Sequence, residues 1–139
     1  MLSETDLFSR NGFHLVPLRV LLVEDSRVLA ERLRESLDTL DGVEVVGAVS
    51  DESSAVAAAR EKQVDVIILD LQLKEGTGFG VVQRLGAKRP KIIVFTNYML
   101  PEYQRLADSL GVEYFLNKSK DYERLPQLIQ ELGAGEKPN

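Results

Sequence analysis

The segment VDVIILDL, residues 64–71, decides the fold. Within it, the apolar run Val66–Leu69 is followed at once by the carboxylate of Asp70. A strand without polar alternation has both faces covered, as in a parallel sheet between two layers of helices. Open α/β sheets bind ligands at the carboxyl ends of their strands. Asp70 is therefore placed where chemistry is expected, although an Asp after a buried strand also often begins a turn or caps a helix.

Segments typical of strands and helices alternate through the rest of the chain. Apolar runs rich in β-branched residues predict further strands at residues 19–23, 43–48, 91–95 and 112–116. Apolar side chains spaced three or four positions apart predict helices at residues 27–40, 50–61, 79–89, 101–110 and 122–132. Ser26 is the expected N-cap of the first helix, and Pro101 the expected first residue of the fourth. A βα unit repeated five times implies a parallel α/β sheet with helices on both faces.

Both ends of the chain lie outside this pattern. Residues 1–17 show no sustained period and are interpreted as an N-terminal extension, residues 18–132 as one domain, and residues 133–139 as a flexible tail. His14, the sole histidine, falls in the extension. Because no other histidine or cysteine is available to complete a metal site, we interpret His14 as a packed or solvated side chain.

Composition restricts the classes of function. A chain of 139 residues fits one domain with a core that needs neither disulfides nor metals. The net charge of −5 disfavours nucleic acid or an acidic membrane as a direct partner and favours a protein or a small molecule. Without cysteine there is no thiolate nucleophile or metal ligand. No apolar run approaches the ~18 residues of a membrane span, so we expect a soluble, cytoplasmic protein.

Four of the five expected strands end in a reactive or polar side chain: Glu24 and Asp25 after the first, then Asp70, Thr96 and Lys118. Parallel strands point the same way, so these groups are expected at one edge of the sheet. Three carboxylates in one small pocket repel one another, and without a cation at least one would bind a proton. Oxygen ligands without cysteine or histidine favour Mg²⁺ or Mn²⁺. The sequence therefore predicts a divalent-cation site there.

Carboxylates, a divalent cation, an ammonium and a hydroxyl around one anion suit phosphoryl transfer, in which catalysis is mostly positioning and charge neutralisation. A carboxylate can itself be the nucleophile and form an acyl phosphate. Asp70 is the candidate, because its strand is central and the glycine-containing loop behind it can supply backbone donors.

At this point the chain resembles the response-regulator receiver domain of two-component signalling, over residues 18–132. The matching positions, in order along the chain, are Glu24 and Asp25, Asp70 in VIILDLQL, Thr96 in IIVFTN and Lys118 in EYFLNKS. The resemblance implies a flavodoxin-like fold, a (βα)5 sandwich with parallel strand order 2-1-3-4-5.

The resemblance also implies roles for single residues. Asp70 would accept a phosphoryl group from a phosphohistidine on a sensor histidine kinase or phosphotransfer protein. Lys118 would pair with a phosphoryl oxygen, Thr96 would move to bond another, and Phe115 would turn inward as the switch aromatic, although Phe115 also suits an ordinary core position. The expected ligands of Mg²⁺, or of Mn²⁺, are Asp25, Asp70, Glu24 through water, and the main-chain carbonyl of Gln72. Such a protein modifies itself and is not a turnover enzyme on a separate substrate.

Two positions depart from the family pattern. Lys118 is usually followed by proline with a cis peptide bond, and here by Ser119. A non-proline cis bond costs about 2.5 to 4 kcal/mol, so the isomer of this bond is open. Lys74 stands where the family often has proline, four residues after the phosphoacceptor. Gln72 and Asn97 lie where side chains can screen or orient attacking water, which leaves the lifetime of the phosphoryl group open.

We expect the receiver to signal through a protein partner. The face formed by the helix at residues 101–110, the strand at 112–116 and the helix at 122–132 is the expected output surface and a candidate homodimer interface. It carries Tyr98, Tyr103, Phe115 and Lys120. The two tyrosines fit half-buried packing equally well.

Alternatives remain open. An aspartyl-phosphate hydrolase usually has a general acid two residues after its nucleophile, where this chain has Gln72. A flavodoxin-like flavin binder would have its flavin phosphate repelled by three acids. A receiver that signals without phosphorylation is disfavoured, since every phosphorylation position is filled. The chain also fits a receiver fragment of a longer DNA-binding or enzymatic regulator.

Overall fold

The computed structural model describes residues 16–135. Of the extension expected at residues 1–17, all but residues 16 and 17 lie outside the described part, as does His14. Residues 136–139 of the expected tail lie outside it too. Within residues 16–135, no helix combines the length and apolar character needed to cross a membrane.

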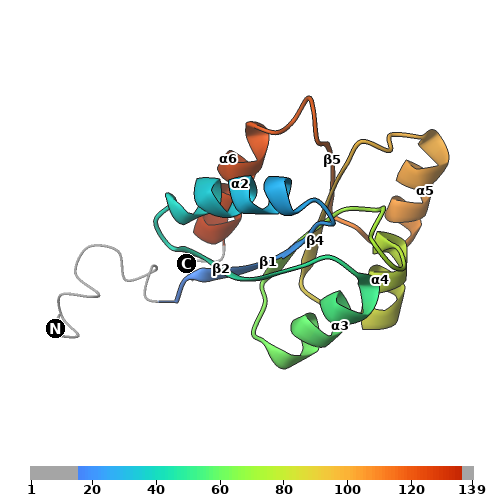
Figure 1. The fold of residues 1–139 in the computed structure, drawn as a ribbon, viewed down its shortest axis with the longest axis horizontal. Coiled ribbons are helices and arrows are strands. Elements are labelled where there is room, and N and C mark those ends of the chain that lie inside the picture. Colours follow the sequence, from blue (N-terminus) through green and yellow to red (C-terminus); the bar gives the residue numbers. More distant parts are fainter. Residues whose placement is uncertain (1–15, 136–139) are drawn as a thin grey trace, which may run out of the picture.

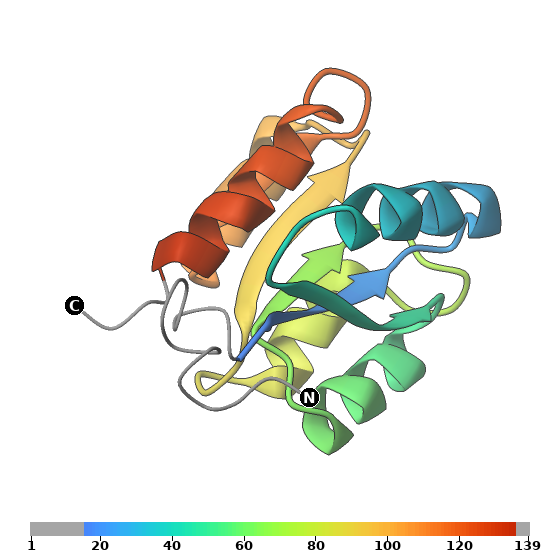
Figure 2. The same cartoon turned by 90° about the vertical axis from the view of Figure 1, so that its left-hand side faces the viewer.

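Five parallel strands form one sheet in the order β2-β1-β3-β4-β5, which confirms the predicted topology (Figure 1). Figure 2 shows the strands running in the same direction with the expected twist. All four residues of β3 are buried, as a central strand requires. The strands are β1 (Leu18–Val23), β2 (Val43–Val49), β3 (Val66–Leu69), β4 (Lys91–Thr96) and β5 (Tyr114–Asn117).

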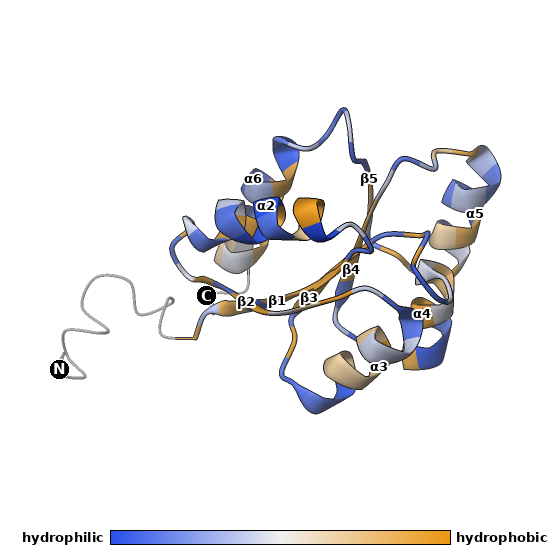
Figure 3. Ribbon diagram, in the orientation of Figure 1, coloured by the Kyte–Doolittle hydropathy of each residue, from blue (hydrophilic) through white to orange (hydrophobic). Residues whose placement is uncertain are grey.

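Helices cover both faces of this sheet. On one face lie α2 (Arg27–Asp38) and α6 (Arg124–Gly135), and on the other α3 (Glu52–Glu61), α4 (Gly78–Leu85) and α5 (Pro101–Ser109) (Figure 1). Alternate residues of each central strand enter the two cores: Ile67 and Leu69 pack toward α3, α4 and α5, and Val66 and Ile68 toward α2 and α6. Figure 3 shows the apolar sheet between helices that are hydrophilic on their outer sides.

Local sequence signals place the helix starts. Ser26 Oγ accepts a hydrogen bond from Leu29 N at 3.2 Å, so the predicted N-cap of α2 is confirmed. Asp51 and Thr77 cap α3 and α4 in the same way. Pro101 is the first residue of α5, as predicted, because its missing N–H costs nothing in a first turn.

Most elements begin or end a few residues from their expected bounds; α4, for example, ends at Leu85 and not at residue 89. Two of these differences have a reason in the structure. β5 begins at Tyr114 and not at residue 112, because Val112 N is bonded back to Ala107 O of α5 at 2.9 Å and the carboxylate of Glu113 takes the Ile92 N–H. α6 continues to Gly135, so residues 133–135, expected as the start of a tail, are helical. A glycine within a helix costs about 1 kcal/mol relative to alanine and does not by itself end the helix.

Candidate functional site

The predicted site residues meet at the carboxyl edge of the sheet. Glu24 and Asp25 follow β1, Asp70 follows β3, Thr96 is the last residue of β4, and Lys118 follows β5. Backbone hydrogen bonds to neighbouring strands fix three of these positions: Glu24 N donates to Val49 O at 2.9 Å, Asp70 N to Val23 O at 3.0 Å, and Lys118 N to Thr96 O at 3.0 Å. The sheet ladder therefore continues into the site and holds its backbone in register.

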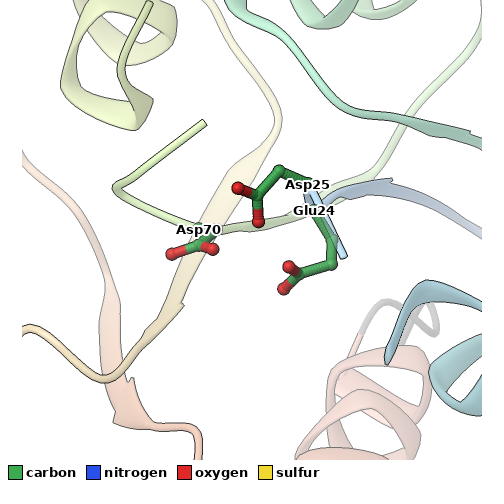
Figure 4. Close-up of side chains that lie close together, drawn as sticks. All are labelled: Glu24, Asp25 and Asp70. Carbon is green, nitrogen blue, oxygen red and sulfur yellow. The ribbon is translucent and has the colours of Figure 1, made fainter. Parts of the chain in front are cut away.

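The three acids form one cluster (Figure 4). One carboxylate oxygen from each of Glu24, Asp25 and Asp70 lies within 4.8 Å of the other two. Glu24 and Asp70 are only 5% and 4% exposed, whereas Asp25 is exposed. Two buried carboxylates and one open to solvent give a site that is reached from one side.

Lys118 bridges the two buried acids. Its Nζ lies 2.7 Å from Glu24 Oε1 and 2.8 Å from Asp70 Oδ2, and its side chain is 14% exposed. The remaining oxygens are also engaged, since Ser26 N donates to Glu24 Oε2 at 2.9 Å and Gln72 N to Asp70 Oδ1 at 3.3 Å. Both carboxylates are therefore oriented by a cation on one side and a backbone amide on the other.

Burial and pairing oppose each other in this group. Desolvation raises the pKa of Glu24, even though the hydrogen bond from Lys118 favours the ionised form. For Lys118, desolvation acts to lower the pKa, but hydrogen bonds to Asp70 and Glu24 outweigh it and the pKa is raised. Lys118 is thus held as an ammonium. The ionised form of Glu24 is disfavoured by burial, and a further positive charge nearby would stabilise it.

The donor set fits a hard divalent cation. Two ligands of one Mg²⁺ stand about 2.1 Å from the ion, hence at most about 4.2 Å apart, and small side-chain movements would bring oxygens within 4.8 Å to that separation. With all groups ionised, the three acids exceed the single ammonium of Lys118 by two negative charges, which one divalent cation neutralises. Both oxygens of Glu24 and both oxygens of Asp70 already accept hydrogen bonds, so the exposed Asp25 is the acid best placed to bind the ion without breaking a contact.

The two predicted switch residues lie beside this cluster and not within it. Thr96 is fully buried, and its Oγ1 accepts a hydrogen bond from Tyr98 N at 3.2 Å. Among residues 16–135, no hydrogen bond joins Thr96 to the side chain of Asp70 or Lys118. Phe115 is half-buried and packs against the core beneath α3, α4 and α5. Their coupled movement stays a prediction.

Comparison with known proteins identifies the family. The family model described as "Response regulator receiver domain" matches residues 20–130. The chain belongs to the response regulator receiver domain family. It is therefore a receiver of two-component signalling, and its sheet order is the one expected for that fold.

Relatives of this receiver include longer regulators. It is 29% identical over 120 residues to the transcriptional regulatory protein DesR of Bacillus subtilis (strain 168), covering 86% of this chain but 60% of DesR. A two-component response regulator of the LuxR family from Aurantimonas sp. SI85-9A1 superposes with a TM-score of 0.76 at 26% identity, covering 87% of this chain and 88% of that one. The phosphorylated cyanobacterial phytochrome response regulator RcpA shares the fold, with a TM-score of 0.71 at 24% identity and coverage of 84% and 91%.

At Ser119, where the family usually has proline, side chains form a hydrogen-bond network. Every peptide bond among residues 16–135 is trans, including Lys118–Ser119. Asn117 Oδ1 accepts hydrogen bonds from the amides of Ser119 and Lys120, both at 2.8 Å, and Ser119 Oγ donates to Asn97 Oδ1 at 3.1 Å. Asp121 closes the loop by accepting from Asn117 N at 2.8 Å. These polar contacts fix the loop that carries Lys118.

The departure at Lys74 has a local reason. Lys74 N donates a hydrogen bond to Ser50 O at 3.1 Å, which a proline could not make. The Lys74 side chain helps to line a cavity of about 440 Å³ beside the acids. The wall of this cavity combines acidic and basic residues, including Glu24, Asp25, Arg27, Arg34 and Lys74.

The expected output surface is partly exposed. Tyr98 is 43% exposed, while Tyr103 is half-buried and makes an edge-to-face contact with Phe79 at a ring separation of 6.0 Å. Both tyrosines and Gln72 line a second cavity, of about 390 Å³. Tyr103 is thus a half-buried packing residue, whereas Tyr98 is exposed to solvent next to the site.

Sequence reasoning missed the residues that hold the two loops of the site. Asn117 and Asp121 lie in one polar segment. Asn117 could have drawn attention, because an Asn side chain in a turn typically bonds the backbone two residues on, as Asn117 does with Ser119 N. Glu52 at the start of α3 also contacts the loop after Asp70, through Thr77 N at 3.0 Å. No local pattern marks Glu52, since the partners of its side chain are 25 or more residues away.

Proposed function

We propose that Asp70 is the phosphoacceptor of this receiver, in a Mg²⁺-dependent reaction with a phosphohistidine on a sensor histidine kinase or phosphotransfer protein. The observation that carries the proposal is the placement of Asp70. Its carboxylate is buried, touches the ammonium of Lys118 at 2.8 Å, and shares a cluster with two further acids. Acidic clusters of this kind are where receiver domains generally bind Mg²⁺, and the same-fold protein RcpA is described as phosphorylated.

The chemistry follows from these groups. A carboxylate oxygen of Asp70 bonds to phosphorus while the bond from phosphorus to the imidazole nitrogen breaks; the nitrogen keeps the electron pair and takes up a proton. Lys118 keeps its contact with the carboxylate of Glu24, and its ammonium turns from the former carboxylate anion of Asp70 to a phosphoryl oxygen. Bound Mg²⁺ would supply charge neutralisation, held by Asp25, Asp70, the Gln72 carbonyl and, through water, Glu24. Mn²⁺ suits the same oxygen ligands.

Signalling would then pass through Thr96. Its hydroxyl accepts a bond from Tyr98 N and keeps its own proton to donate to a phosphoryl oxygen. Movement of Thr96 would open space on the β4 side of Phe115, which pairs in the ladder with Val94. We propose that Phe115 turns inward and changes the face of α5, β5 and α6, which binds a downstream protein or a second copy of the chain.

As a second candidate, we propose that this receiver is one domain of a longer regulator. The chain spans 60% of the length of DesR, a transcriptional regulator, and the Aurantimonas relative is named as a LuxR-family regulator. In either case the domain itself would catalyse only its own phosphorylation and dephosphorylation. Its cytoplasmic location stays a prediction.

Substitution at Asp70 tests the proposal directly. We expect acetyl phosphate with Mg²⁺ to add one phosphoryl group to the wild type and none to Asp70→Asn, because an amide oxygen is a poor nucleophile. Intact mass under mildly acidic conditions is the measurement. Asp108→Asn, an exposed change on α5, is the matched control and should be modified like the wild type. Equal modification of Asp70→Asn and the wild type would remove Asp70 from this role.

A further inference from the structure

Glu52, the first residue of α3, binds the loop that follows Asp70. Its Oε1 accepts a hydrogen bond from Thr77 N at 3.0 Å, and its Oε2 pairs with Arg84 of α4 at 3.3 Å. Its own amide donates to Glu75 O at 2.9 Å. The side chain is only 21% exposed. Glu52 therefore connects α3 to both ends of the segment between Glu75 and α4.

Glycines leave room for this carboxylate. A Cβ built at Gly76, whose φ is +82°, would overlap the Glu52 side chain, and so would a Cβ built at Gly80. At Gly76 the positive φ is a second reason for glycine. Lys74 N donates to Ser50 O just before α3, so the loop is attached to the start of this helix at a further point. The loop thus follows the surface of Glu52 closely.

The same loop holds Asp70 at its other end. Gln72 N donates to Asp70 Oδ1 at 3.3 Å, and Gln72 forms an antiparallel bridge with Thr77, the residue that Glu52 binds. Gly78 N donates to Leu71 O at 2.9 Å and closes the turn. A short chain of contacts therefore leads from Glu52 through Thr77 and Gln72 to the carboxylate of Asp70.

We propose that Glu52 is a positioning residue for the phosphorylation site. It fixes the loop so that the amide of Gln72 can donate to Asp70 and the carbonyl of Gln72 can bind the Mg²⁺ ion. This inference rests on the proposed function of Asp70. A carboxylate acceptor is suited to the task, since hydrogen bonds to charged groups are stronger than neutral ones. Loss of supporting residues behind metal ligands typically weakens metal binding by about 10- to 100-fold.

The test compares Mg²⁺ binding by four variants, followed through the amide NMR shifts of Gln72 and Thr77. Glu52→Ala removes the acceptor, and Glu52→Asp shortens it by one methylene, so both should weaken Mg²⁺ binding by about tenfold. Glu52→Gln keeps an oxygen for Thr77 N and should recover most of the affinity. Glu61→Ala, at the exposed end of the same helix, is the matched control and should bind like the wild type.

A purely structural role would give a different result. It would lower the urea midpoint of unfolding of Glu52→Ala and Glu52→Asp while their folded forms bound Mg²⁺ as tightly as the wild type. Wild-type affinity in whichever of these two variants folds overturns this inference and leaves the role of Asp70 standing. A wild type that binds neither Mg²⁺ nor beryllofluoride overturns both.

Discussion

Asp121 is the residue that holds the loop carrying Lys118. Its carboxylate accepts a hydrogen bond from Asn117 N at 2.8 Å and pairs with Arg124 at 2.9 Å. These contacts, the backbone hydrogen bond first, lower the pKa of Asp121 from its ordinary value. A carboxyl group with a lower pKa in the folded state stabilises the fold above its unfolded pKa, and loses that contribution as the pH falls through its folded pKa.

We predict that Asp121→Ala lowers the free energy of unfolding at about pH 7 and reduces the difference in stability between about pH 7 and about pH 3. The reason is that part of the acid sensitivity of the wild type arises from protonation of Asp121. Urea unfolding at the two pH values is the measurement, with Asp38→Ala, an exposed change at the end of α2, as the control. An unchanged pH difference in Asp121→Ala would show that its carboxylate is not coupled to folding.

At the scale of elements, the close approach of α4 to the end of β3 depends on one glycine. A Cβ built at Gly78 would overlap the carbonyl oxygen of Asp70 and would come within 3.0 Å of Leu71 Cα. Both are backbone atoms and cannot rotate away. Gly133 in α6 is the opposite case, since the nearest atom to an added Cβ is Leu18 Cβ at 3.9 Å, which is ordinary contact.

Alanine at these two positions should therefore have opposite effects. We predict that Gly78→Ala destabilises the receiver by about 1–3 kcal/mol through overpacking, and that Gly133→Ala stabilises it by about 0.5–1 kcal/mol through higher helix propensity. Thermal and urea unfolding of the two variants measure both changes. A Gly78→Ala protein as stable as the wild type would mean that α4 can move away from β3 at little cost.

The elements themselves were predictable from the sequence, but not all of their ends. Hydropathy runs predicted the central strands, because a buried strand must be apolar and its first polar neighbour marks the edge of the sheet, as at Asp70. The start of β5 was not predictable in this way. Glu113 stops the ladder with a side-chain hydrogen bond to Ile92 N, a contact between residues 21 apart that no local pattern contains.

At the scale of the whole molecule, Lys118 connects the acids to the expected output face. It contacts Glu24 and Asp70 through its side chain, and its backbone continues from β5, which carries Phe115. Phe115 and Tyr103 pack against the same core cluster. These contacts support the proposal that a change in charge at Asp70 reaches this face through Lys118. The part of Thr96, the last residue of the neighbouring strand, stays a prediction.

We predict that Lys118→Ala still binds Mg²⁺, since Asp25 and Asp70 remain, but no longer transmits a response to β5. In the wild type, beryllofluoride with Mg²⁺ should shift the NMR signals of Phe115 and Tyr103; in Lys118→Ala these shifts should be largely lost. Lys120→Ala, an exposed lysine two residues away, should respond like the wild type. The same Phe115 shifts in Lys118→Ala would assign the coupling to Thr96 alone.

The candidate site was predictable as a set of strand ends, and its supports were not. Parallel topology brings Glu24, Asp70 and Lys118 to one edge whatever the details of the loops. By contrast, the contacts of Glu52 with Thr77 depend on how a helix start and a distant loop happen to meet in space. Such contacts form only when the fold is assembled, and the hydropathy pattern of either segment does not predict them.

The position of β5 has one more consequence. Within residues 16–135, β5 is an outer strand that pairs only with β4, and the chain leads from it directly into Lys118, whose ammonium contacts the buried acids. The acids follow the inner strands β1 and β3. Outer strands open more readily than inner ones. Brief opening of β5 would move the Lys118 ammonium away and leave the acids in place. Phosphorylation of Asp70 would then stop for a short time in a molecule that is otherwise folded.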